Sequence, residues 1–194
     1  MVLQGQPLPP LRPESRPGRQ QRQADHGNWS GLPESFTRGV DAALTRRDKP
    51  TVGYLFKDDQ YVRWNLEADA ADPGYPKPIA AGWSGLPEPF KLGIDAAVNH
   101  QSDPAVAWFF KDDQYVRYDV AADKALAGPK PIAENWPGLP DSFHGSVDAA
   151  APHATDPGKV YLFKDDQYVR YDLAADRADS GYPKPIKGNW DFFR

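Results

Sequence analysis

The stretch Phe-Lys-Asp-Asp-Gln-Tyr-Val-Arg stands at residues 56–63 and recurs without a single difference at residues 110–117 and 163–170. An Asp-Ala-Ala segment precedes each copy and begins at Asp41, Asp95 and Asp148. Tryptophans follow the same period, with spacings of 54, 53 and 54 residues between Trp29, Trp83, Trp136 and Trp190. Self-similarity at a period of this length indicates a solenoid or a propeller.

Each repeat contains four segments that are typical of short strands; in the first repeat they are residues 40–44, 53–56, 61–66 and 76–79. We expect residues 57–60 to join the second and third strands as a hairpin, because Asp tolerates left-handed backbone. One helical turn is expected between Trp83 and the next repeat. The Ala-Ala pair suits a narrow inner strand, and the prolines suit an outer edge strand. These features favour a propeller blade of four antiparallel strands over a solenoid.

The sequence therefore predicts an all-β protein, a propeller over residues 28–194 with repeats at about 28–81, 82–134 and 135–188. Residues 1–27 hold five Pro, five Gln and four Arg without apolar periodicity. Such a composition cannot bury enough apolar surface to offset the entropy of ordering. We expect these residues to form a disordered tail.

Composition narrows the functional classes. The chain has no cysteine, which excludes disulfides, thiol nucleophiles and Cys-based metal sites. A net charge of −4 gives no reason to expect nucleic acid as a partner. We expect no membrane span and see no secretory signal, which leaves the compartment unknown. Nucleophile-elbow, P-loop, dinucleotide and zinc-protease motifs are missing from the sequence, and its carboxylates recur by repeat symmetry. We therefore do not expect an enzyme.

Several segments resemble hemopexin repeats, namely Val-Asp-Ala-Ala, Tyr-Leu-Phe-Lys-Asp-Asp-Gln-Tyr-Val-Arg-Tyr-Asp and Gly-Tyr-Pro-Lys-Pro-Ile. The resemblance covers three tandem copies and implies the four-bladed β-propeller of that family, with a central tunnel that holds ions. It assigns main-chain carbonyls facing a cation to Asp41, Asp95 and Asp148. It assigns backbone lining the next ion site to Ala43, Ala97 and Ala150. Calcium or sodium suits such oxygen ligands; the alternative is that each Asp only caps its strand entry.

A second candidate site lies on one rim of the propeller. His100 and His153 hold equivalent positions in repeats two and three, and Arg46 stands there in repeat one. Together they could bind an anion, a haem propionate or a metal; the alternative is that they are separate loop residues. Serum hemopexin, to which the repeats are similar, uses two propellers and a linker for haem. Haem is therefore not expected as a cofactor here.

Two departures from the family pattern bear on function. Asp58, Asp112 and Asp165 stand where the family commonly has Gly, so these hairpins are expected to be strained or to turn differently. Only three full repeats of a normally four-bladed disc are present, which would leave two apolar blade faces open. The chain could be a fragment, a second chain could fill the gap, or three blades could spread to close it.

We expect the open faces to bind a protein partner or a second copy of the chain. The leading hypothesis is a non-catalytic hemopexin-like binding module, with a cation in its tunnel. The alternative is a haem or small-ligand carrier, or a storage or toxin-associated protein. Family members are often extracellular, but the compartment of this chain is left open.

Overall fold

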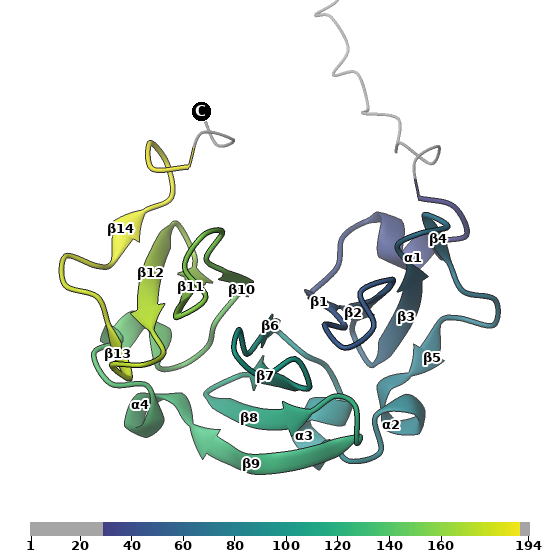
Figure 1. Ribbon diagram of the computed structural model, residues 1–194, viewed down its shortest axis with the longest axis horizontal. Helices are drawn as coiled ribbons and strands as arrows, with labels where there is room; N and C mark the ends of the chain where they lie inside the picture. The colour runs from purple at the N-terminus through teal and green to yellow at the C-terminus, as the bar shows by residue number, and fades with distance from the viewer. Residues whose placement is uncertain (1–28, 191–194) are drawn as a thin grey trace, which may run out of the picture.

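The computed structural model describes residues 29–190, which form three antiparallel sheets around a common centre (Figure 1). The prediction of a disordered tail over residues 1–27 lies outside the described part. We call the sheets blades one, two and three in chain order. Blade one consists of β1 (Ala42–Thr45), β2 (Val52–Lys57), β3 (Gln60–Asn65), β4 (Ala70–Ala71) and β5 (Lys77–Pro78).

The other two blades repeat this topology. Blade two consists of β6 (Ala96–Asn99), β7 (Val106–Lys111), β8 (Gln114–Asp119) and β9 (Lys124–Pro131). Blade three consists of β10 (Ala149–Pro152), β11 (Lys159–Lys164), β12 (Gln167–Asp172), β13 (Arg177–Ala178) and β14 (Lys184–Pro185). The prediction of an all-β fold whose blades consist of antiparallel strands is confirmed.

Short helices lie before blade one and in the connections between the blades. They are α1 (Glu34–Thr37), α2 (Ile79–Gly82), α3 (Glu88–Lys91), α4 (Ile132–Asn135) and the 3-10 turn η1 (Asp141–Phe143). The helical turn expected after Trp83 is α3, whereas α2 and α4 were not predicted. Among the described residues, no helix has the length and apolar character needed to cross a membrane.

The hairpin inside each blade follows directly from the repeated octapeptide. Lys57 pairs with Gln60 across β2 and β3, so the turn itself holds only Asp58 and Asp59. Asp58 lies in the left-handed region with φ 51°, and the equivalent Asp112 and Asp165 have φ 50° and 52°. In all three hairpins an aspartate therefore adopts the left-handed conformation, which glycine adopts with the least steric strain.

The outer strand differs from the single strand expected at residues 76–79. In blade one it is split into β4 and β5, which both pair with β3, and Ile79 already begins α2. Blade three is split in the same way. In blade two the segment runs unbroken as β9, with register shifts between Tyr115 and Tyr118. Blade two lacks the tyrosine that stands at Tyr75 and Tyr182, and the shorter connection keeps the strand paired.

The hydrophobic core lies between successive blades. We call the side of a blade that meets the next blade its forward face and the opposite side its backward face. The forward face of blade one, including Leu44 and Phe56, packs on the backward face of blade two, including Phe109 and Tyr118. Trp83 lies in this junction, 5.3 Å from the Phe56 ring and 5.5 Å from the Phe109 ring.

The junction between blades two and three repeats this packing around Trp136. Its ring lies 5.1 Å from Phe110 of blade two and 4.7 Å from Tyr171 of blade three. The indole nitrogens of Trp83 and Trp136 are buried without a hydrogen-bond partner in the described part of the chain. Aromatic rings surround both indoles, in T-shaped and tilted arrangements.

Candidate functional site

The inner strands β1, β6 and β10 lie nearest the common centre (Figure 1), and β6 contacts both of the others. Arg46 N–H donates to the Val52 carbonyl at 2.8 Å. Because bonded and non-bonded pairs alternate in an antiparallel ladder, Leu44 also bonds to β2. Ala43 and Thr45 therefore turn their backbone groups to the opposite, central edge. The bonds of His100 to Val106 and His153 to Lys159 place Ala97 and Ala150 in the same way.

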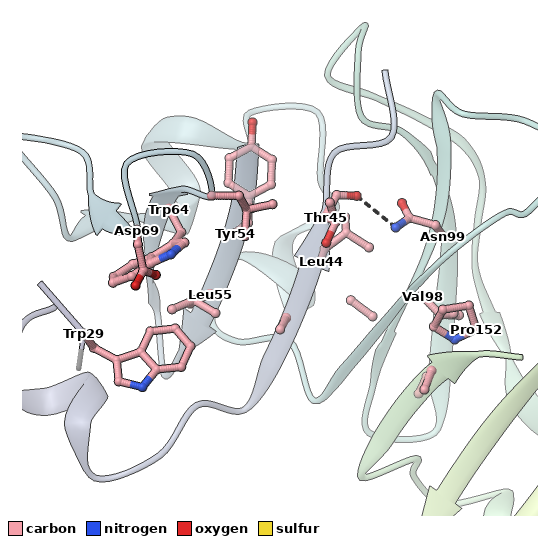
Figure 2. Close-up of a pocket in the computed structure, with 16 residues that line it drawn as sticks. Trp29, Leu44, Thr45, Tyr54, Leu55, Trp64, Asp69, Val98, Asn99 and Pro152 are labelled. Carbon is pink, nitrogen blue, oxygen red and sulfur yellow. Dashed lines mark hydrogen bonds between the residues drawn. The ribbon is translucent and has the colours of Figure 1, made fainter. Parts of the chain in front are cut away.

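A cavity of about 380 Å³ opens at this centre and continues over the backward face of blade one (Figure 2). It is lined by inner-strand residues of all three blades, among them Ala43, Ala97 and Ala150. The Asn99 side-chain amide donates to the Thr45 carbonyl at 2.9 Å and joins β6 to β1 across the cavity (Figure 2). The structure thus brings together the three alanines that the resemblance assigned to the tunnel.

The carboxylates of Asp41, Asp95 and Asp148 are not brought together. The carboxylate of Asp41 accepts the N–H of Asp58 at 2.7 Å, within the hairpin of its own blade. The other two repeat this bond, to Asp112 and Asp165. Within residues 29–190 no group of three or more His, Asp or Glu side chains could hold a metal ion. The side chains of these aspartates cap their hairpins, and a role for their carbonyls remains a prediction.

The rim residues Arg46, His100 and His153 are each held within their own loop. Arg46 forms a bidentate pair with Asp48 at 2.8 and 3.0 Å. The His100 Nδ1 atom accepts the N–H groups of Ser102 and Asp103 at 3.2 and 3.1 Å. Burial, with Arg117 nearby, lowers the pKa of His100 and favours its neutral form.

His153 repeats the arrangement of His100. Its Nδ1 atom accepts the N–H groups of Thr155 and Asp156 at 3.3 and 3.1 Å, and its ring stacks on Tyr161. Each of the three rim residues thus stabilises the loop in which it lies. A shared ligand site on this rim remains a prediction.

The backward face of blade one has no blade packed on it among the described residues (Figure 1). Trp29 is 51% exposed, whereas its equivalents Trp83 and Trp136 are 3% and 4% exposed. Leu66 is 48% exposed, whereas its equivalent Val120 is 9% exposed. The sequence keeps apolar side chains here although they face solvent.

The forward face of blade three is open in the same manner. Ala149 is exposed, and Tyr161 and Phe163 are half-buried. The equivalent residues of blade two are buried by blade three, namely Ala96, Trp108 and Phe110. Repeat counting predicted two open faces, and the structure identifies the residues that form them.

One pair of residues in the open cavity was missed from the sequence. Trp64 and Asp69 both line it, beside Trp29 (Figure 2). The signal was available, because Trp64 follows the repeated octapeptide directly where repeats two and three have Tyr118 and Tyr171. A residue that differs between repeats, directly after a segment that is identical in all three, indicates that the surroundings of this position differ in blade one.

Three sheets of one topology, with small residues on the inner strands and aromatic junctions between blades, define a propeller-type repeat protein. The family model for hemopexin matches residues 40–88, 94–141 and 147–194. The chain belongs to the hemopexin family, as the sequence predicted.

The chain is similar to several known members. It is 32% identical over 149 residues to matrix metalloproteinase-21 of Xenopus laevis, a match that covers 72% of this chain and 23% of that protein. It is 28% identical over 164 residues to albumin-2 of Pisum sativum, covering 80% of this chain and 71% of the albumin. The chain thus spans less than a quarter of the metalloproteinase.

Solved structures give the same result. The seed albumin LS24 of Lathyrus sativus superimposes with a TM-score of 0.66 at 27% identity, covering 78% of this chain and 69% of that one. A plant lectin with two metal binding sites from Cicer arietinum superimposes with a TM-score of 0.63 at 28% identity, covering 76% of this chain and 68% of that one. These relatives support the class of a hemopexin-fold binding module.

Proposed function

We propose that the chain is a non-catalytic protein-binding module whose binding surface is its open side. The occupant is a single four-stranded blade of another polypeptide, which packs between the forward face of blade three and the backward face of blade one. The observation that carries this proposal is the exposure of Trp29, 51%, at a position that is 3% and 4% exposed in the two closed junctions.

The two closed junctions support this choice of occupant. In both, a forward face of alanine and aromatic residues packs on a backward face around a tryptophan. The two open faces are of these same two kinds, so one blade can cover both at once. A terminal repeat that ends in solvent needs a polar outer face, whereas the backward face of blade one exposes Trp29 and Leu66. Exposed apolar patches of this kind mark interfaces.

An extended chain tests whether the open side accepts a blade. A second copy of residues 141–194 is joined after Arg194, which places the copied Asp148 twelve residues after Trp190, the same spacing as in the three existing repeats. We expect the added blade to shield Trp29 from acrylamide quenching and to raise the unfolding temperature. The matched control carries aspartate at the copied positions of Leu162 and Phe163. Equal quenching of Trp29 in both extended chains would contradict the proposal.

We also propose that a hard cation binds at the centre, held by main-chain carbonyls of the inner strands. The residues fit, because Ala43, Ala97 and Ala150 turn to the centre backbone groups that form no hydrogen bond within residues 29–190, and all three line one cavity. Oxygen donors of this kind suit calcium or sodium. A bound cation would offset the carbonyl dipoles and tie the three inner strands together. The similarity to a plant lectin with two metal binding sites is compatible with this proposal.

Calorimetric titration with CaCl₂ and NaCl tests the cation. We expect Asp95→Ala to leave the affinity unchanged, because its carboxylate is bonded to Asp112 and Lys111. Ala43→Lys places an ammonium group on the open side of blade one, within reach of the centre, and is expected to weaken binding through charge repulsion. Ala80→Lys, on an exposed helix position, is the charge-matched control. Absence of binding heat and of any thermal shift with either salt would refute the site.

A further inference from the structure

Blade one carries an aromatic and acidic site that its sister blades lack. The Trp29 and Trp64 rings lie 4.9 Å apart at an angle of 57°. Asp69 lies beside them, and all three residues line the open cavity of about 380 Å³ (Figure 2). The Asp69 side chain is exposed, whereas Trp64 is buried against the sheet.

The equivalent aspartates of the other blades are already bonded. The Tyr118 hydroxyl donates to Asp123, which also accepts the Ser84 hydroxyl at 2.8 Å. The Tyr171 hydroxyl donates to Asp176 at 2.8 Å. The backbone at the three turns is the same, with φ of 49°, 52° and 48° at Asp69, Asp123 and Asp176.

Blade one differs because Trp64 has no hydroxyl to offer. Within residues 29–190 no side chain forms a hydrogen bond or ion pair with Asp69. The substitution of tyrosine by tryptophan therefore does two things at once. It leaves the Asp69 carboxylate without the tyrosine partner of the other blades, and it places a buried indole directly behind the exposed ring of Trp29.

We propose that the exposed Trp29 ring and the Asp69 carboxylate, with Trp64 packed behind Trp29, bind the guanidinium or ammonium group of a basic side chain on the docked protein. Indole faces attract cations, most strongly where the site is shielded from water. A carboxylate beside them adds a charge-assisted hydrogen bond. This inference rests on the proposed function, since it names the side chain that anchors the docked blade.

The closed junction between blades one and two supports this assignment. There the cleft that contains Asp123 is also lined by Arg46 and Arg63 of the preceding blade. A blade in front of blade one would occupy the position from which those arginines come. The same geometry would place its basic residues at Asp69.

The test uses the full chain and a small probe. N-acetyl-arginine amide is titrated while the indole N–H resonances are followed by NMR. N-acetyl-citrulline amide, which is isosteric and neutral, is the matched probe. We expect arginine, but not citrulline, to shift the Trp29 and Trp64 resonances in a saturable manner. Equal shifts with both probes, or none with either, would overturn the proposal.

Three variants locate the site. Asp69→Asn is expected to weaken arginine binding about tenfold, through loss of a hydrogen bond to a charged group. Trp64→Tyr restores the residue of the other blades, whose hydroxyl would engage Asp69, and is expected to abolish binding in a folded chain. Glu67→Gln, an exposed carboxylate in the same turn, is the control and should bind as the parent chain does. Parent-like binding by Asp69→Asn and Trp64→Tyr would overturn the site.

The extended chain separates the two proposals. If arginine does not bind but the added blade shields Trp29, the docking surface stands and the basic anchor is wrong. If arginine binds but the added blade leaves Trp29 open to quencher, the cation site stands and the docked blade is wrong.

Discussion

Alanine 97 shows how one residue type serves two environments at the inner strands. Ala97 is 4% exposed between β6 and β1, whereas the equivalent Ala43 is exposed on the open side of blade one. The sequence makes the two positions identical, so nothing in the local residues distinguishes them. Only the presence or absence of a neighbouring blade does.

This difference predicts opposite tolerance to a larger side chain. Ala97→Leu is expected to lower the free energy of unfolding by about 1–3 kcal/mol, because Ala97 is buried in the core between blades one and two, where added methyl groups overpack the junction. Ala43→Leu is expected to change it by less than about 0.5 kcal/mol, as at other exposed positions. Urea denaturation of both variants measures the difference. Equal losses would mean that the side of blade one is covered.

Residue roles were only partly predictable from the sequence. Two interpretations of Asp41, Asp95 and Asp148 were left open, and the structure shows that their carboxylates bind the hairpin turn of the same blade. The role of their carbonyls stays a prediction. The contribution of Asn99, which donates to Thr45 of another blade, could not be foreseen. Its partner is a backbone atom 54 residues away, and contacts of this kind depend on the arrangement of blades.

At the scale of elements, the repeated octapeptide predicted the hairpins well. Alternating side chains and a tight turn are local properties, and all three copies fold alike, although the turn holds two residues where a loop over residues 57–60 was expected. The outer strands were predicted less well. Whether the fourth strand stays paired depends on one inserted tyrosine and on the path of the chain around it, which residue preferences alone do not give.

The second hairpin of blade three offers a test of its ion pairs. Lys159 on β11 faces Asp172 on β12, with 2.9 Å between Nζ and Oδ2. The N–H groups of Ala175 and Ala174, together with Lys159, lower the pKa of Asp172 from 3.8 to about 2. A carboxylate whose pKa is lower in the folded than in the unfolded chain stabilises the fold fully at pH values above its unfolded pKa of 3.8. This stabilisation is lost as the pH falls toward the folded pKa of about 2.

We therefore expect the stability of the chain to decrease between about pH 4 and pH 2, in part through protonation of Asp172. In the Asp172→Asn variant, the urea midpoint of unfolding should fall less steeply over this pH range than it does in the parent chain. Asp166→Asn, in the exposed turn of the same hairpin, is the control and should keep the parent slope. Identical slopes for Asp172→Asn and the parent chain would contradict the role of this carboxylate.

At the scale of the whole molecule, three repeats predicted three blades and two open faces, but not how the blades would be placed. The structure keeps the radial arrangement of the family, with one side of the ring left without a sheet in the described residues (Figure 1). Blade–blade packing explains this result. The aromatic junctions around Trp83 and Trp136 fix the turn between neighbours, so three blades do not spread to close.

Open apolar faces also predict concentration-dependent association. We expect sedimentation velocity to show species heavier than the 21.6 kDa chain as its concentration rises. Leu66→Asp, on the open face, should weaken this association, whereas Leu92→Asp, on an exposed position outside the faces, should not. A single compact species of 21.6 kDa at every concentration would contradict association through the open faces.

The central claim is that the backward face of blade one is exposed and ready to be covered. Hydroxyl-radical footprinting of the isolated chain at low concentration, with oxidation of each tryptophan read by mass spectrometry, tests it most directly. We predict rapid oxidation of Trp29 and protection of Trp83 and Trp136. Protection of Trp29 equal to that of the two junction tryptophans, in a chain shown to be monomeric, would contradict the account.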